Sequence, residues 1–214
     1  MLTKLRIQNF KAWKDTGEIR LAPITVFFGA NSAGKTSLLQ FLSMLKQTAE
    51  SSDRRRVLQP GGDYSLVDLG TFQDLIFEHD LSRELEFELA WTLPKSLKVS
   101  DPSNGVISNV SAISFSAAIA TLGEAQHVDW LRYESLGEGG QRPLSARLAR
   151  SKSQEHELTT EGYKLIRVPG RVWPLRSPER FYGFPNEVPT RCQNAAFIDD
   201  LTFEPEEQMK RFLY

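Results

Sequence analysis

The first hydrophobic pattern along the chain is an alternation over residues 2–9. Leu5 and Ile7 fall on one face and charged or amide side chains fall between them, which predicts a half-buried strand. A second short strand is expected over residues 18–21. Residues 24–28 read Ile-Thr-Val-Phe-Phe and carry no charge, so they predict a third strand, buried on both faces.

The pattern then changes from a strand period to a helix period. Four apolar residues follow at spacings i, i+3, i+4 and i+7, which place one stripe along a helix. They are Leu38, Phe41, Leu42 and Leu45. We expect this helix to begin near Lys35 and to fade near Thr48, where the sequence becomes polar.

From about residue 81 the pattern is that of short strands separated by turns. Leu85, Phe87 and Leu89 alternate with glutamates, and further strands are expected over residues 110–120, 127–134, 147–149 and 163–168. Together these predict an antiparallel meander. A proline-dense stretch over residues 169–189 predicts an irregular connector or lid, and residues 204–213 predict a final helix.

Composition narrows the function classes only modestly. The chain has 214 residues and a formal net charge of −1, so overall charge does not indicate nucleic acid or an anionic membrane. The one dense basic run, residues 54–56, is expected to be a solvated loop. With a single cysteine, Cys192, neither an internal disulfide nor a zinc-finger site is possible. No signal peptide or membrane-spanning run is present, and a cytoplasmic location is the expectation.

The strongest chemical signal is the stretch Gly-Ala-Asn-Ser-Ala-Gly-Lys-Thr at residues 29–36, which matches the phosphate-binding pattern G-x-x-x-x-G-K-[ST]. Glycines let successive backbone N–H groups point inward, and the following helix directs its positive end at the phosphates. Lys35 is expected to reach the β- and γ-phosphates of ATP, and the Thr36 hydroxyl to ligate Mg²⁺. The predicted nucleotide-binding residues of this loop are Gly29, Ala30, Asn31, Ser32, Ala33, Gly34, Lys35, Thr36 and Ser37.

The opening of the chain resembles the N-terminus of RecF-, SMC- and OLD-like ATPases of the ABC class. These proteins begin with a strand ending in Asn-Phe-Lys or Asn-Phe-Arg, and here Asn9-Phe10-Lys11 precedes the loop in the same way. Residues 68–75, Asp-Leu-Gly-Thr-Phe-Gln-Asp-Leu, are similar to a segment of bacterial AAA-type members found in antiphage defence and nuclease-associated systems. The resemblance is strong over residues 1–80 and only architectural over residues 81–170.

The resemblance implies an α/β fold, a P-loop ABC-type head lobe with an antiparallel β subdomain. It divides the chain into an ATP-binding lobe (residues 1–80), a β arm (81–170) and a Pro-rich connector that starts a further part (171–214). Such heads bind ATP and Mg²⁺ and dimerise with ATP sandwiched between them. Asn31 would then approach the γ-phosphate or the attacking water. Lys11 and Trp13 would lie near the base and phosphates, although Trp13 equally fits a core anchor.

Two parts of a complete head are not evident. Residues 136–141 resemble the signature motif L-S-G-G-Q of ABC-type heads, but Pro143 lies where the helix after that motif would begin. A glycine hairpin loop is therefore the better interpretation. Residues 195–200 echo a strand ending in acidic residues, but the apolar run is short, and a loop or edge strand is favoured over a Mg²⁺ role for Asp199. Gln73 is a weak candidate for the glutamine that senses the γ-phosphate in such heads.

The chain is therefore interpreted as the N-terminal portion of a longer ATPase, which alone would bind nucleotide poorly and hydrolyse almost none. The predicted role is an ATPase head in DNA repair or antiphage defence that controls a partner effector or nuclease. Its expected partners are a second copy in a homodimer or higher oligomer, and DNA. The alternative is a regulatory module that binds ATP without hydrolysing it. A P-loop kinase or GTPase is disfavoured by the strand pair before the loop and the β arm after it. The effector, nucleic acid and trigger are not identified by the sequence.

Overall fold

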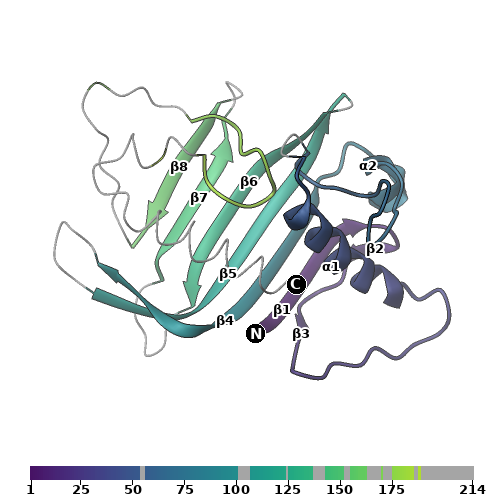
Figure 1. Ribbon diagram of the computed structural model, residues 1–214, viewed down its shortest axis with the longest axis horizontal. Helices are drawn as coiled ribbons and strands as arrows, with labels where there is room; N and C mark the ends of the chain where they lie inside the picture. The colour runs from purple at the N-terminus through teal and green to yellow at the C-terminus, as the bar shows by residue number, and fades with distance from the viewer. Residues whose placement is uncertain are drawn as a thin grey trace.

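One antiparallel sheet forms the body of the chain (Figure 1). The computed structural model describes residues 1–53, 56–100, 107–123, 125–136, 143–151, 155–162, 170, 175–185 and 188. The sheet has eight strands in the order β2-β1-β4-β5-β6-β7-β8, and β3 also pairs with β1. Their bounds are β1 (Leu2–Phe10), β2 (Trp13–Asp15), β3 (Ile19–Arg20), β4 (Leu85–Ser100), β5 (Ile107–Leu122), β6 (Ala125–Leu136), β7 (Ser145–Arg150) and β8 (His156–Glu161). All pairings between the described strands are antiparallel.

The helices lie at the β1 side of this sheet. Helix α1 (Lys35–Glu50) crosses one face near β1 and β4, and the short helix α2 (Phe72–Leu75) lies by β2 with the 3-10 helix η1 (Phe77–His79) after it (Figure 1). The main chain of Phe10 forms an isolated bridge with Ile76, so the end of β1 is joined directly to this helical segment. The fold is thus a mixed α/β fold with a mostly antiparallel sheet.

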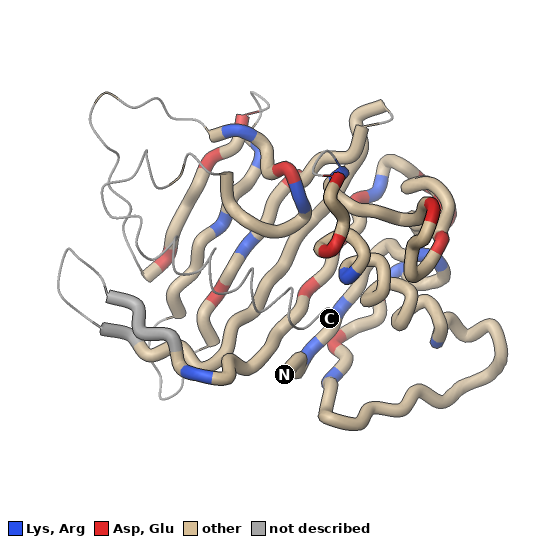
Figure 2. The backbone as a smooth tube through the Cα atoms, viewed as in Figure 1, with Lys and Arg blue, Asp and Glu red and all other residues tan. Residues whose placement is uncertain are grey.

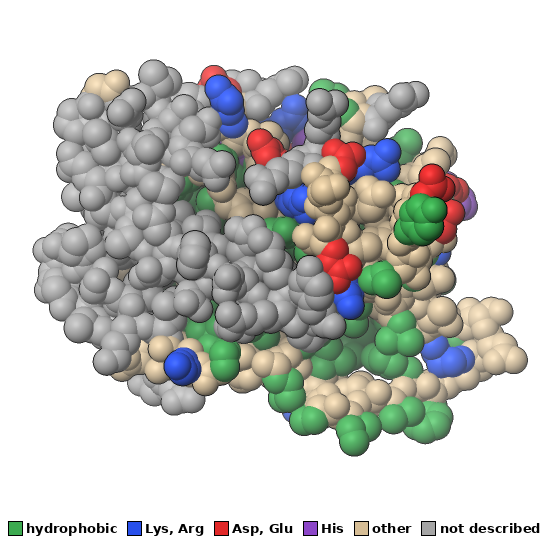
Figure 3. All heavy atoms as spheres, viewed as in Figure 1, with side chains coloured by type: hydrophobic (Ala, Val, Ile, Leu, Met, Phe, Trp, Pro, Cys, Tyr) green, Lys and Arg blue, Asp and Glu red, His purple; other side chains and the backbone are tan. Residues whose placement is uncertain are grey.

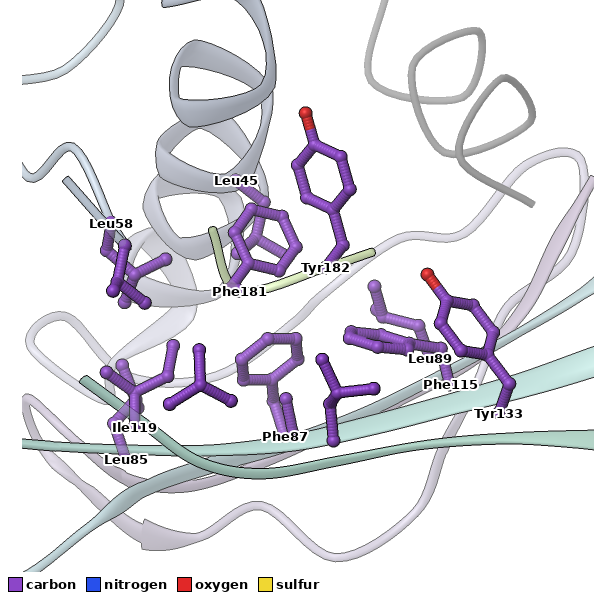
Figure 4. Close-up of a cluster of buried hydrophobic side chains, with 14 of the residues drawn as sticks. Leu45, Leu58, Leu85, Phe87, Leu89, Phe115, Ile119, Tyr133, Phe181 and Tyr182 are labelled. Carbon is purple, nitrogen blue, oxygen red and sulfur yellow. The ribbon is translucent and has the colours of Figure 1, made fainter. Parts of the chain in front are cut away.

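The helix-facing side of the sheet is the core. Leu85, Phe87 and Leu89 on β4 are buried as their alternation predicts, because one face of each strand points at α1. Figure 4 shows these side chains below the helix, together with Phe115 of β5. Phe41 of α1 joins the two layers, with ring centroids 5.2 Å from both Phe10 and Phe87.

The other face of the sheet is polar and carries paired charges. Lys4 Nζ lies 2.9 Å from Glu88 and 3.0 Å from Glu18, and Arg6 bonds Asp15 at 2.6 Å. The Arg6 guanidinium lowers the pKa of Asp15 from its ordinary value. Figure 2 shows positive and negative residues side by side on the strands. These pairs fix the register of β1 against its neighbours at one edge of the sheet.

A segment distant in sequence closes the core between α1 and the sheet. Phe181 and Tyr182 are buried, and Figure 4 shows Phe181 between the helix and Phe87. The Arg180 guanidinium donates to the carbonyls of Thr48, Ala49 and Ser51 at the end of α1. Residues 175–185 of the predicted connector are irregular as expected. They are also structural, since they cap the helix and fill its packing against the sheet.

The predicted strand over residues 24–28 is the clearest error of the sequence analysis. The segment has no strand assignment and pairs with no described strand. The side chains of Ile24, Val26 and Phe28 are 85%, 62% and 90% exposed. Figure 3 shows hydrophobic side chains along the outer edge of the loop between β3 and α1. β-branched and aromatic residues favour extended backbone, but a buried strand also needs neighbouring strands, and the described residues supply none here.

Other predictions were correct in kind and differ in extent. Helix α1 begins at Lys35 as expected, and the strands of the arm are longer than predicted. Strands β2 and β8 were missed because they are short or largely polar. The predicted strand over 163–168 and helix over 204–213 lie outside the described residues, as do residues 54–55, 137–142 and 195–200. The proposed boundary at residue 80 remains a prediction, although β1 and β4 share one sheet.

Within the described part of the chain, no helix is long and apolar enough to cross a bilayer.

Candidate functional site

The loop of residues 29–34 turns sharply into helix α1. Ser32 and Gly34 have positive φ angles of 65° and 78°, and Gly34 is the N-terminal cap residue of the helix. Ala33 N–H donates to the Ala30 carbonyl at 3.3 Å, and Ser37 N–H donates to the Gly34 carbonyl at 3.1 Å. These turns give the curled backbone that the sequence pattern predicts for an anion-binding loop.

Lys35 lies across the loop that precedes it. Its Nζ donates to the Gly29 carbonyl at 2.8 Å and to the Ala30 carbonyl at 2.5 Å. The side chain therefore bends back from the first turn of α1 to the start of the loop, and its charge lies at the loop's mouth. This places a cation beside the backbone N–H groups that would face a phosphate.

The start of helix α1 adds a second attraction for anions. Among the described residues, no side chain caps its N-terminus, and its first turn contains no acidic residue. The helix has 16 residues, so its aligned peptide dipoles leave a partial positive charge at this end. The positive end of the helix and the Lys35 side chain together form a site suited to phosphate.

The predicted Mg²⁺ ligand Thr36 is exposed in the first turn of α1, and Asn31 is exposed at the tip of the loop. No group of three or more His, Cys, Asp or Glu side chains capable of holding a metal occurs in the described ranges. The role of Thr36 as a Mg²⁺ ligand remains a prediction.

Trp13 contacts the end of the loop at which helix α1 begins. Its indole Nε1–H donates to the Gly34 carbonyl at 3.1 Å. The ring is half-buried and packs against the core, as expected of a core anchor. Its N–H edge also contacts the loop, so Trp13 lies beside the candidate site. A Cβ atom added at Gly34 would lie 2.7 Å from Trp13 Nε1, which leaves no room for any side chain at that position.

Lys11 lies on the flank of α1 rather than at the loop. Its Nζ donates to Gln40 Oε1 at 3.3 Å, and its backbone N–H donates to the Leu75 carbonyl at 2.6 Å. It thus links the turn after β1 to both α1 and α2. Gln40 was not anticipated from the sequence, because only this contact distinguishes it from any other polar helix residue.

The second half of the segment 68–75 forms helix α2. Thr71 and Asp74 make a reciprocal capping box, and hydrogen bonds from Thr71 lower the pKa of the Asp74 carboxyl. Gln73 is exposed, and its carbonyl lies 3.1 Å from His79 Nδ1. The structure thus places Gln73 on a well-capped helix beside Lys11, and its γ-phosphate role remains a prediction.

Replacing Gly34 with Ala should disrupt this site. The new Cβ would meet the Trp13 indole and would also need a left-handed backbone, which costs about 1–2 kcal/mol for a residue with a Cβ. We expect lower stability in urea unfolding and a loss of ATP affinity in calorimetric titration. Gly17→Ala is the matched control, since Gly17 has a φ of 63° but nothing within 4 Å of an added Cβ.

Gly17→Ala should carry the backbone cost alone and leave ATP affinity unchanged. If both variants lost stability equally and both kept their ATP affinity, the close contact between Gly34 and Trp13 would have no functional consequence.

A family model described as AAA ATPase domain matches residues 1–161 of the chain. The matched range includes the phosphate-binding loop, α1, α2 and the sheet through the last residue of β8. Among curated proteins, no match to the chain was found.

Proposed function

The chain belongs to the AAA ATPase domain family, and from that premise we propose that it forms the ATP-binding part of an ABC-type, RecF/SMC/OLD-like ATPase head. The observation that carries the proposal is the position of Lys35, whose Nζ lies over the carbonyls of Gly29 and Ala30 at the open end of α1. A cation, an uncapped helix N-terminus and a curled glycine loop converge there, and together they suit the polyphosphate of ATP.

These groups would bind the polyphosphate of ATP in the following way. The N–H groups of the loop and of the first turn of α1 would donate to phosphate oxygens, and Lys35 would exchange its carbonyl contacts for the β- and γ-phosphates. Thr36 would hold Mg²⁺, which supplies charge neutralisation between the two phosphates when bound. Asn31, exposed at the loop tip, would face the γ-phosphate or the attacking water.

Hydrolysis needs groups beyond these. A catalytic head also requires a carboxylate to polarise water and an acidic residue near Mg²⁺. No acidic side chain among the described residues contacts Lys35 or caps α1. The exposed segment at residues 24–28, which pairs with no described strand, leads directly into the loop and supports the same proposal, since a strand from elsewhere could cover it. We propose that the site is completed by additional residues and by a second head that sandwiches the ATP.

The biological role we propose is control of a partner nuclease or other effector, in DNA repair or antiphage defence, in the cytoplasm. It rests on the similarity of residues 68–75, which form the approach to α2 and the helix itself, to such proteins. The described surface gives one reason to favour protein over DNA as the first partner. The paired charges on the polar face of the sheet leave no broad basic patch there for a phosphate backbone.

A regulatory module that binds ATP without hydrolysing it is the second candidate. The position of Lys35 at the loop is equally compatible with it, because Lys35, the loop and the start of α1 would be enough to bind phosphate without hydrolysing ATP. The two candidates differ in whether ATP is consumed.

Sedimentation velocity and ATP turnover of the same preparation test the proposal. We expect ATP, and not ADP, to shift the chain toward a dimer, with turnover near background, and Lys35→Ala to remove the shift. Lys46→Ala, which removes a lysine from the other end of α1, should keep it. Ordinary turnover that Lys35→Ala abolishes would show that this chain completes its own site. A monomer at every ATP concentration would contradict the sandwich.

A further inference from the structure

The contact between Trp13 and Gly34 fixes the orientation of one peptide group at the candidate site. The indole Nε1–H donates to the Gly34 carbonyl at 3.1 Å, and the ring occupies the space where a Cβ at Gly34 would lie. Ser37 N–H donates to the same carbonyl at 3.1 Å. The Gly34 carbonyl therefore has two donors and is held on the side of the loop that faces β2.

The same peptide group carries the backbone N–H of Lys35. Every peptide bond among the described residues is trans, and in a trans peptide the C=O and the following N–H point in opposite directions. Because Trp13 holds the Gly34 carbonyl, the Lys35 N–H must point away from Trp13. Because Lys35 is the first residue of α1, its N–H points out of the N-terminal end of the helix, where a phosphate would be bound.

We propose that Trp13 is a positioning residue for phosphate binding, which acts through the Gly34–Lys35 peptide and does not stack on the nucleotide base. The inference rests on the proposed function of the loop as an ATP site. Trp13 is well suited to the role, because it lies on strand β2 and pairs in register with Phe10, a fully buried residue of β1. A strand paired with the sheet thus holds the donor that contacts the loop.

The hydrogen bond from Trp13 to Gly34 also favours this role over stacking on the base. A tryptophan that stacks on a base needs a free ring face. Here the N–H edge is directed at the Gly34 carbonyl and the half-buried ring packs against the core. Removing the N–H should therefore affect every polyphosphate ligand equally, whether or not it carries a base.

Trp13→Phe is the test, because it keeps an aromatic ring and removes the donor. We expect the dissociation constants of ATP and of inorganic tripolyphosphate to rise by the same factor, about 3- to 10-fold for a lost hydrogen bond, in calorimetric titrations with Mg²⁺. Trp130→Phe is the matched control, since Trp130 is half-buried on β6 beside Arg147 and remote from the loop. A loss confined to ATP would assign Trp13 to the base, and unchanged affinities for both ligands would overturn the proposal.

A second measurement tests, without any nucleotide, whether Trp13 orients the Gly34–Lys35 peptide. In ¹⁵N–¹H correlation spectra of the ligand-free protein, Trp13→Phe should shift the Lys35 amide resonance, whereas Trp130→Phe should leave it in place. An unshifted Lys35 amide in Trp13→Phe would overturn the inference. If the unaltered chain bound neither ATP nor tripolyphosphate, the proposed function would fail, and the spectra would still decide whether Trp13 orients this peptide.

Discussion

Replacing Lys35 with Ala is expected to weaken ATP binding by about 10- to 100-fold, the largest effect of any single change in the loop. Lys35 Nζ lies 2.8 Å from the Gly29 carbonyl, at the end of the loop where we propose that the phosphates bind. A charge-assisted contact from a lysine to phosphate contributes about 1.5–3 kcal/mol, which corresponds to that factor. Isothermal titration with Mg²⁺ and ATP measures it directly.

Lys46→Ala controls for the loss of a positive charge on the same helix. Lys46 Nζ lies 3.7 Å from the carboxylate of Glu50, the last residue of α1, so Lys46 belongs to the end of the helix opposite the loop. The ATP affinity of the Lys46→Ala variant should equal that of the unaltered chain within the error of the titration. Equal losses for the two variants would mean that ATP responds to the net charge of the helix and that Lys35 has no specific position in the site.

Replacing Phe41 with Ala is expected to destabilise the fold by about 3–5 kcal/mol, the usual cost of removing a fully buried aromatic side chain. Phe41 is completely buried, and its ring meets Phe10 of β1 and Phe87 of β4 at 5.2 Å each. Losing both ring contacts would leave a cavity between α1 and the sheet. Urea denaturation followed by circular dichroism measures the free energy of unfolding.

Leu39→Ala is the matched control for that loss, because Leu39 is on the same helix but 57% exposed. Its stability change should stay within about 0.5 kcal/mol, as is usual for surface positions. A similar loss at both positions would contradict the placement of α1, since it would mean that the exposed side of the helix is also packed.

The sequence predicted the parts of the fold that depend on side-chain spacing. The helical stripe placed Leu38, Phe41 and Leu45 correctly in the core, and the alternation on β4 identified which face of that strand is buried. Both patterns are local, so each can be recognised from about ten residues of sequence. The curl of the loop and the start of α1 at Lys35 followed from the phosphate-binding pattern in the same way.

The parts that depend on distant partners were not predictable. Phe181 packs against Phe87 and Phe115, but nothing near residue 181 in the sequence indicates a core position more than 60 residues from those partners. His156 on β8 is buried although its strand is largely polar. Residues 24–28 show the converse, because their composition is that of a buried strand and the described chain offers no strand to pair with them.

The site shows the same division between local and distant information. The loop residues that would contact phosphate were predictable as a group, because the pattern that names them is contiguous. The hydrogen bond of Trp13 to Gly34 was not, since it joins residues 21 positions apart through a strand that was itself missed. Sequence alone therefore indicated the ligand, and the structure supplied the contacts that would orient the loop for it.

Competition between ligands tests most directly the claim that this loop recognises the phosphates of ATP. A fluorescent ATP analogue would be displaced from the chain by ATP, by inorganic tripolyphosphate and by adenosine in turn, each with Mg²⁺ present. The account predicts saturable binding, displacement by ATP and by tripolyphosphate at similar concentrations, and no displacement by adenosine. Displacement by adenosine with none by tripolyphosphate would contradict it, because the site would then recognise the base and not the phosphates at Lys35.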